Sequence, residues 1–353
     1  MEARESGKPH VNYLRALTAA GKLAYAPNAP AQAMARGSTN VLGLLVHDIA
    51  DPYFSSIATG VMRAAEKQNL IVTIFNTWRR PEREVEYART LRGQRARALI
   101  VAGSRVDDLV AQEQLEQELV EFESAGGRAV FVSQGRSGFD TVVLENRSGA
   151  RLLAERLAEL GHRRFLVLAG PSKLRTSTDR VQGFREGLAR HSIQLSRDQV
   201  LRGEFTRDGG FKAMIRALDL GLAPDCVFAV TDVMAVGAMA ACRHRGVHVP
   251  EDLAVAGFDD IATLRDVTPS LTTVQMPLDD VGAMALELVV AERADRPRLR
   301  RVKGRVVLRD STARPTRPGR PRRSQQVAAG DPPAAPMKRT MRGGGAAAGH
   351  TSG

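Results

Sequence analysis

Short apolar runs alternate with helix-forming segments along most of this chain, and this alternation limits the folds open to it. The first run, Val41–Ile49, is almost continuously apolar. Strands that are apolar throughout, rather than at alternate positions, are typical of parallel sheets buried on both faces. The pattern therefore predicts an α/β fold with doubly wound parallel sheets. Further strands are expected at Ile71–Phe75, Ala98–Ala102, Ala129–Ser133, Arg164–Ala169, Cys226–Thr231 and Leu253–Phe258.

The segments between these runs have helical periodicity with charges on one side. One strand and one helix together repeat roughly every 25–30 residues, which is the length of a βα unit. No recurring motif indicates a solenoid. The expected helices are Ser55–Gln68, Glu82–Gly93, Val106–Ser124, Asn146–Leu160, Asp179–His191, Gly209–Leu220 and Asp232–Arg245. Beyond them, Leu271–Gln275 is expected to cross between subdomains, Leu278–Ala291 to form a helix and Arg305–Leu308 to form a last strand.

The expected domain organisation has three parts: residues 1–40, a core at 41–312, and a tail at 313–353. The number of predicted strands favours two sheets over one. The break at 135–140 (GRSGFD) is the expected switch between two subdomains. The tail is rich in Pro, Arg, Gly and Ala, cannot bury a core, and is expected to be disordered. It holds more than half of the net charge of +12. The first subdomain is expected at about 41–140 and 276–300, and the second at about 141–275 and 301–312.

Composition and motifs exclude several classes of protein. No apolar run approaches the roughly 20 residues of a membrane span, and the first residues, MEARESGKPH, have no apolar segment of a secretory signal. The two cysteines, Cys226 and Cys242, lie in apolar segments, which indicates buried reduced thiols in a cytoplasmic protein. The chain has no G-x-S-x-G, P-loop, G-x-G-x-x-G or H-E-x-x-H motif. We therefore expect no enzymatic activity, no cofactor and no metal site.

Polar and aromatic side chains follow several predicted strands at their carboxyl ends. In an open α/β sheet, ligands bind beyond this edge. Aromatic rings with carboxylates and amides around them suit a neutral polyhydroxylated or heterocyclic ligand. For any single aspartate, capping the next helix is the simpler explanation, but several such residues coincide here. The candidates are Asp51, Tyr53, Phe54, Gln134, Asp232, Phe258, Asp259, Asp260 and Gln275.

Two basic clusters flank the predicted helix at Glu82–Gly93. Arg79-Arg80 precedes the helix, and Arg92–Arg97 overlaps its end. Because the helix carries Glu82, Glu84 and Glu86, a solvated face of paired charges is expected there.

The segment before the first strand is expected to contain two short helices. Val11–Tyr25 has the apolar spacing of an amphipathic helix. Ala29–Ala35 could form about two turns, with Asn28 as N-cap and Pro30 in the first turn. Two turns are not stable alone. We therefore expect this segment to be ordered only against another surface.

Seven motifs follow one another along the chain. They are YAPNAPAQAMARGSTNVLGLLVHDIADPYF (25–54), GHRRFLVLAG (161–170), DRVQGFREGL (179–188), CVFAVTDVMAVGAM (226–239), VPEDLAVAGFDD (249–260), PSLTTVQMPLDDVG (269–282) and VVLRDST (306–312). In this order they resemble the LacI/GalR family of bacterial transcription repressors, over about residues 11–312. The resemblance implies a type I periplasmic-binding-protein-like core and a homodimeric, ligand-responsive regulator of transcription. In such a regulator, effector binding between the subdomains changes their closure, and so the fit of two hinge helices to operator DNA.

The resemblance also assigns roles to residues of the pocket. Arg180, in DRVQGF, matches an arginine that binds effector hydroxyls. Phe258 and Asp259 match a stacking aromatic and a hydroxyl-binding carboxylate. Tyr53 and Phe54 match the opposite wall, while Phe205 and Gln275 match further pocket positions. Gln134-Gly135 stands where many sugar-binding members have Asp-Arg, and Thr231-Asp232 where Asn-Asp is usual. The implied effector is therefore a sugar, a related polyol or a nucleobase.

The resemblance implies DNA contacts from the hinge helix. Met34 matches the apolar wedge that such helices insert into the minor groove. A family member begins with a helix-turn-helix that reads the major groove, but Val11–Tyr25 matches only the last helix before the hinge. Residues 1–40 are thus expected to be a remnant of that domain plus the hinge helix. The alternative function is an effector-binding module without sequence-specific DNA binding. The implied DNA contacts are Asn28, Ala31, Gln32, Met34 and Ala35.

Overall fold

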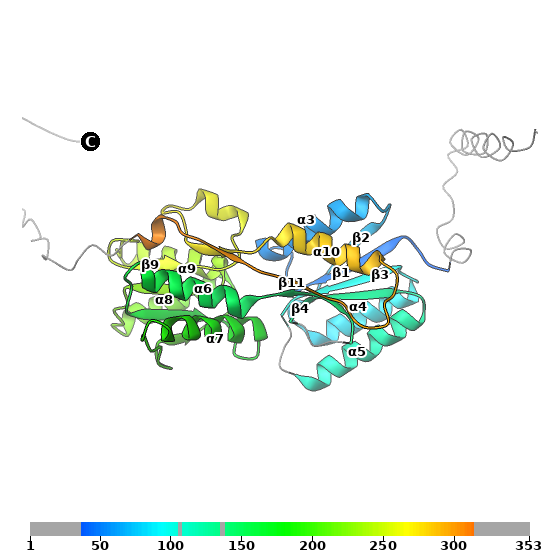
Figure 1. The fold of residues 1–353 in the computed structure, drawn as a ribbon, viewed down its shortest axis with the longest axis horizontal. Helices are drawn as coiled ribbons and strands as arrows, with labels where there is room; N and C mark the ends of the chain where they lie inside the picture. The colour runs from blue at the N-terminus through cyan, green and yellow to red at the C-terminus, as the bar shows by residue number, and fades with distance from the viewer. Residues whose placement is uncertain (1–36, 105–107, 135–137, 314–353) are drawn as a thin grey trace, which may run out of the picture. The chain divides into compact units, whose positions relative to one another are not determined.

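The computed structural model describes residues 37–104, 108–134 and 138–313 (Figure 1). These residues form two α/β lobes, each built on its own parallel sheet. The fold class predicted from the apolar runs is confirmed. In the part of the chain that is described, no helix is both long and apolar enough to cross a bilayer.

The sheet of the first lobe holds six described strands in the order β11-β5-β4-β3-β1-β2, all parallel. Helices α4 and α5 pack against each other, as do α3 and α10. The strands are β1 Val41–Val46, β2 Ile71–Asn76, β3 Ala98–Ala102, β4 Arg128–Ser133, β5 Asp140–Leu144 and β11 Leu299–Val302. The helices are α3 Pro52–Glu66, α4 Pro81–Gly93, α5 Leu109–Ser124 and α10 Leu278–Val290.

Burial on both faces explains the continuous apolar sequence of β1. Leu42 and Leu44 belong to a core that includes Ile57 of α3. Leu45, pointing to the opposite face, belongs to a second core with Leu91 of α4. Since successive side chains of a strand point to opposite faces, every position of this central strand must be apolar.

The sheet of the second lobe has the order β7-β6-β8-β9 among the described strands, again all parallel. Helix α6 packs against α7, and α8 packs against α9. The strands are β6 Phe165–Ala169, β7 Val200–Arg202, β8 Cys226–Ala229 and β9 Ala254–Ala256. The helices are α6 Asn146–Glu159, α7 Arg175–Ala189, α8 Arg207–Asp219 and α9 Asp232–His244.

The chain crosses between the lobes after β5, after β10 (Thr273–Gln275) and before β12 (Arg305–Val307). Strands β10 and β12 form an antiparallel ribbon. Beyond the ribbon, the buried Ser311 accepts a hydrogen bond from the Thr272 N–H (2.8 Å) and donates one to the Val255 carbonyl (2.7 Å). The motif VVLRDST therefore returns the chain to the second lobe and fastens it beside β9. Short 3₁₀ turns lie at Ala262–Asp266 and Asp310–Thr312.

Three strands were missing from the sequence prediction: β5, β7 and β11. Strand β5 directly follows the predicted break and pairs with β4, so the first sheet continues to Leu144. The first strand ends at Val46 instead of Ile49, because the backbone turns there toward α3.

Glycines allow α3 and α10 to pack closely. A Cβ atom added to Gly60 of α3 would collide with the carbonyl oxygen of Asp279 in α10. The collision is with backbone, so a substitution forces the helices apart.

We expect Gly60→Ala to lower the free energy of unfolding by about 1–3 kcal/mol, because it overpacks this contact. Urea denaturation measures the change. Gly93→Ala is the control, since an added Cβ at that helix end has nothing within 4 Å. Equal stability of the two variants would contradict the close helix contact.

Candidate ligand-binding site

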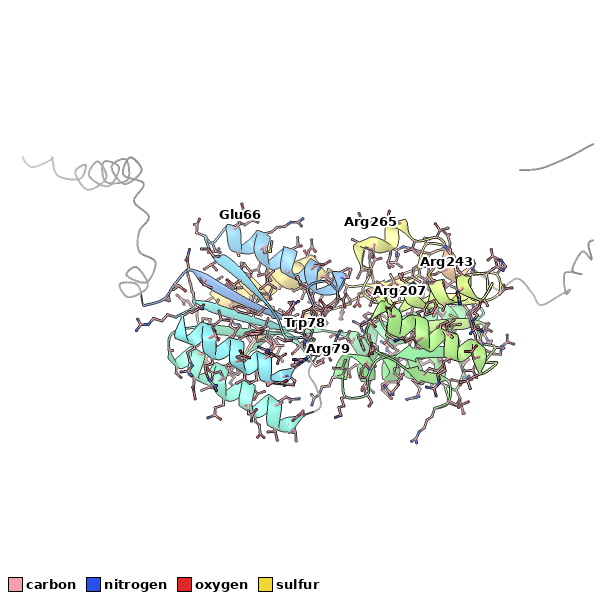
Figure 2. The ribbon with its side chains drawn as sticks, turned by 180° about the vertical axis from the view of Figure 1, so that it is seen from behind. Glu66, Trp78, Arg79, Arg207, Arg243 and Arg265 are labelled. Atoms are coloured by element: carbon pink, nitrogen blue, oxygen red, sulfur yellow. The ribbon has the colours of Figure 1, made fainter. Side chains whose placement is uncertain are left out.

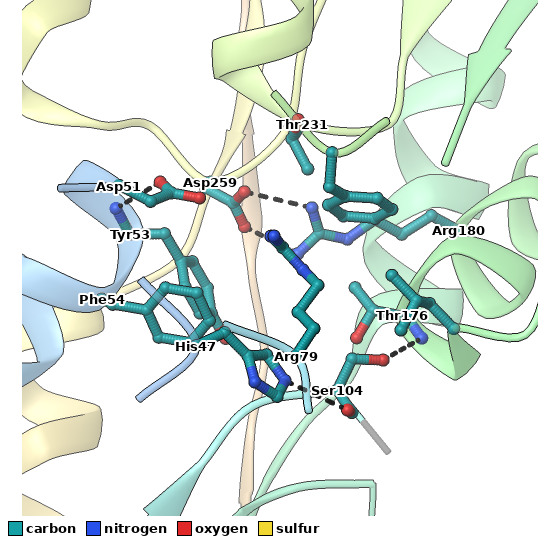
Figure 3. Close-up of a pocket in the computed structure, with 12 residues that line it drawn as sticks. His47, Asp51, Tyr53, Phe54, Arg79, Ser104, Thr176, Arg180, Thr231 and Asp259 are labelled. Atoms are coloured by element: carbon teal, nitrogen blue, oxygen red, sulfur yellow. Dashed lines mark hydrogen bonds and ion pairs between the residues drawn. The ribbon is translucent and has the colours of Figure 1, made fainter. Parts of the chain in front are cut away.

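A cavity of about 40 Å³ lies between residues of the two lobes (Figure 3). Its lining residues all follow the carboxyl ends of parallel strands, which is where α/β sheets bind ligands. They are His47, Asp51, Tyr53, Phe54, Arg79 and Ser104 from the first lobe, and Leu174, Thr176, Arg180, Phe205, Thr231 and Asp259 from the second.

Arg180 forms the floor of the cavity and is 1% exposed. Its guanidinium donates two hydrogen bonds to the carboxylate of Asp259, at 2.7 and 3.1 Å. It also donates to Asn146 Oδ1 (2.9 Å) and to the carbonyl oxygen of Val230 (2.6 Å). The guanidinium carbon lies 3.8 Å from the centroid of the Phe258 ring. These contacts leave the guanidinium a single orientation.

Asp259 is held in place by its backbone as well as by Arg180. Its φ of 119° lies in the left-handed region, which is uncommon for a residue other than glycine. Its N–H donates to the Val274 carbonyl (2.9 Å), and its own carbonyl accepts from Met276 (3.2 Å). Burial raises the pKa of Asp259 to about 6, and Arg180 opposes that shift. The ion pair with Arg180 favours the ionised carboxylate, whose oxygens accept hydrogen bonds.

The wall from the first lobe is mostly aromatic. Asp51 begins α3 as its N-cap and accepts a hydrogen bond from the Tyr53 N–H (3.0 Å). This cap fixes the turn that brings Tyr53 and Phe54 to the cavity. Their rings meet edge to face, with centroids 4.9 Å apart, and His47 packs against Phe54 at 5.5 Å.

Hydrogen bonds between the lobes cross one side of the cavity. The Thr176 N–H, at the start of α7, donates to Ser104 Oγ (3.1 Å). The amide of Gln134 donates to Thr176 Oγ1 (2.7 Å). Gln134 is thus a contact between the lobes and does not line the cavity.

Six of the eleven predicted pocket residues line the cavity, and five, among them Asp260, do not. Phe258 lies fully buried beneath Arg180. Asp232 is also buried and accepts hydrogen bonds from the Ile261 N–H (3.0 Å) and the Thr273 hydroxyl (2.6 Å). Gln275 donates to Asp260 (2.7 Å) and accepts from Arg305. Together with Gln134, these residues position the strands and loops from which the lining side chains extend. The lining residues are Asp51, Tyr53, Phe54, Arg180, Phe205 and Asp259.

The predicted DNA contacts precede the first described residue. Asn28, Ala31, Gln32, Met34 and Ala35 lie outside the described residues. Within the described ranges, no group of three His, Cys, Asp or Glu side chains could hold a metal ion.

Sequence reasoning missed six lining residues. The sequence pattern places His47 inside a longer first strand, and Arg79 on a solvated face of paired charges. The structure corrects the second assignment, because Arg79 lines the cavity and no ion pair to it is found among the described residues. The others missed are Ser104, Leu174, Thr176 and Thr231, of which only Thr231 ends a predicted strand.

Comparison with known proteins identifies the family. A family model described as a periplasmic binding protein-like domain matches residues 154–312. The regulator GalS of Salmonella typhimurium is 32% identical over 270 residues, which cover 76% of this chain and 77% of GalS. GalR of Escherichia coli is 31% identical over 78% of each chain. The chain belongs to the LacI/GalR family of transcriptional regulators. These relatives are regulators, so the expectation that the chain is not an enzyme is confirmed.

Solved structures of transcriptional regulators share the fold. The complex of the regulator CelR with cellobiose is 28% identical, has a TM-score of 0.68, and covers 83% of this chain and 88% of that one. A LacI-family regulator from Sanguibacter keddieii is 32% identical, with a TM-score of 0.67, covering 77% and 98% of the two chains.

The buried Asp232 makes stability depend on pH. Burial, reinforced by the charge of Asp259, raises the pKa of Asp232 to about 7. In an unfolded chain an aspartate titrates near about 3.9. Between about pH 4 and pH 7 the folded state therefore binds a proton that the unfolded state has lost, and stability falls as the pH rises through this window.

We expect Asp232→Asn to flatten this decline, because the amide can still accept from Ile261 and donate to Thr273. Thermal unfolding midpoints between about pH 5 and pH 8 measure the effect. Asp279→Asn, at an exposed ion pair with Arg63, should keep the wild-type slope. If both variants kept that slope, Asp232 would not carry the pH dependence.

Proposed function

We propose that this chain is a cytoplasmic, homodimeric regulator, acting as a repressor, that binds a small polar effector between its two lobes and operator DNA. The observation that carries the proposal is the Arg180–Asp259 pair, a fixed donor and acceptor side by side beneath aromatic side chains. A sugar-like molecule has hydroxyls that both donate and accept, so it can bind both partners. Its apolar faces suit Tyr53, Phe54 and Phe205.

The names of the relatives support this class of function. They include the regulators GalS and GalR and the repressors PurR and CytR, and the CelR structure holds cellobiose. For this chain we propose a sugar or a related polyol or nucleobase. Ten of the predicted pocket residues, all except Asp260, belong to the proposed site: six contact the effector, and Gln134, Asp232, Phe258 and Gln275 support them.

The size of the cavity supports coupling between ligand binding and movement. Ligand pockets usually measure about 300–1,000 Å³, and this cavity is near 40 Å³. An effector as large as a monosaccharide therefore requires the two walls to separate and close again around it. The hydrogen bonds of Thr176 to Ser104 and Gln134 join the two lobes directly. Whether they are broken or retained would therefore distinguish one arrangement of the lobes from another. Effector binding would then select one arrangement of the lobes, which is the two-state element that regulation requires.

A thermal-shift screen of sugars, polyols and nucleobases tests the effector site. We expect at least one compound to raise the unfolding midpoint. Arg180→Lys should weaken that compound's binding at least about tenfold, because lysine keeps the charge but loses the two-pronged contact with Asp259. Arg63→Ala, which removes an exposed ion pair outside the cavity, should bind normally. Equal affinity of Arg180→Lys and wild type would contradict the site.

Selection of DNA sequences from a random pool tests the DNA-binding part. We expect the full chain to enrich a palindromic site, with an enrichment that changes when the effector is present. The selection must be run at physiological salt, because the arginine-rich residues 314–323 can bind any DNA weakly. If no sequence were enriched while the effector still bound, the chain would be an effector-binding module without sequence-specific DNA readout.

A further inference from the structure

Arg79 is a charged side chain in the cavity wall that pairs with no acid in the part of the chain that the structure describes. It is half-buried and reaches into the cavity from the first lobe (Figure 3). Among the described residues, no carboxylate lies within ion-pairing distance of it, whereas Arg180 on the opposite wall is fully paired. Its guanidinium carbon lies 6.0 Å from the centroid of the Phe205 ring, which belongs to the second lobe. The side chain therefore faces the space that an effector would occupy.

The backbone directs Arg79 toward the cavity. Trp78 and Arg79 have φ values of 53° and 58°, so two successive residues are left-handed. Figure 2 shows both residues where the two lobes meet. The turn is held by hydrogen bonds from the Trp78 N–H to the His47 carbonyl and from the Arg80 N–H to the Thr77 carbonyl, both 3.0 Å. Arg80, the next residue, is exposed and lies at the start of α4. The turn thus separates two adjacent arginines, one facing the cavity and the other solvent.

The nearby acids do not neutralise Arg79 by direct contact. Asp48, Asp51 and Glu204 attract it from beyond ion-pairing distance. Asp51 already caps α3, and burial raises its pKa. Asp259 is bound to Arg180. Glu84 and Asp108 line a smaller hollow that Arg79 also borders, and within the described ranges no ion pair joins either of them to Arg79.

A partly buried charge without a partner is costly. Burial lowers the pKa of Arg79, yet an arginine stays protonated in proteins. A carboxylate or phosphate group would offset this cost with charge-assisted hydrogen bonds, whereas the hydroxyl of a neutral sugar would do so only weakly.

We propose that Arg79 binds an anionic group of the effector, so that the effector is an acidic sugar, either a sugar acid or a sugar phosphate. The proposal rests on the proposed function, because it assigns Arg79 a contact with the effector in the same site. The anionic group lies against Arg79 of the first lobe. The hydroxyls lie against Arg180 and Asp259 of the second. The proposed acidic sugar takes the place of the neutral ligand that the aromatic and carboxylate residues alone suggest.

Calorimetric titration of the full chain with matched ligands tests the proposal. The probes are glucose and galactose, their uronates, and their 6-phosphates; the two acidic series distinguish a carboxylate from a phosphate. We expect at least one acidic probe to bind at least about tenfold more tightly than its neutral parent. That preference should shrink as salt is added. Arg79→Gln should abolish it, leaving the acid no tighter than its parent, while Arg80→Gln, the adjacent exposed arginine, should keep it.

Several outcomes of the titration would overturn the proposal. Neutral parents that bind as tightly as their acids, or an Arg79→Gln variant that keeps the preference, would overturn the role of Arg79. Binding by none of these probes would also overturn the acidic-sugar proposal. The broader screen of polyols and nucleobases then decides the proposed function separately, since a hit there that depends on Arg180 would preserve the effector site without an acidic sugar.

Discussion

The ion pair between Arg180 and Asp259 is the contact on which the rest of the site depends. A buried pair of this kind loses much of its attraction to desolvation, so its contribution to stability is small. Its effect is positional. The guanidinium joins α7 to the end of β9, and its bonds to Asn146 and Val230 add the start of α6 and the end of β8. Four elements of the second lobe thus meet at one rigid polar surface, which is what recognition of a small hydroxylated molecule requires.

That surface is supported by the backbone of Asp259 and by two buried residues. Asp259 has a left-handed backbone, and its main-chain bonds to β10 resist relaxation of that conformation. Asp232 holds the same region from below, through Ile261 on one side and Thr273 on the other. Its buried carboxyl makes stability depend on pH. Phe258 closes the base under the guanidinium. Of the three residues that sequence patterns place beside this edge of the sheet, Asp259 therefore faces the cavity, and Asp232 and Phe258 position it.

The sequence predicts the fold better than the site, for a physical reason. Central strands such as β1 and β8 are buried on both faces, and their composition alone identifies them. Strand β11 (LRRV) lies at an edge and is exposed at three of four positions, so only pairing with β5 makes it a strand. The same limit applies to side chains. Position at a strand end indicates the correct edge of the sheet, but whether a residue such as Gln134 points to the cavity or to the other lobe depends on loop geometry.

Arg79 shows how much such geometry can change. Beside Glu82, Glu84 and Glu86 it has the sequence context of a solvated helix end, and only the left-handed turn at Trp78 brings it to the cavity. The result is a site whose two halves differ in chemistry. The second lobe contributes a neutralised pair, and the first contributes aromatic rings with a cation that has no acid partner among the described residues. A ligand can bias the arrangement of the lobes only if it interacts differently with each arrangement. A molecule with an anionic end and a hydroxylated end satisfies both halves only when the lobes are close. Binding of the anionic group by Arg79 would then be coupled to closure of the lobes around Arg180.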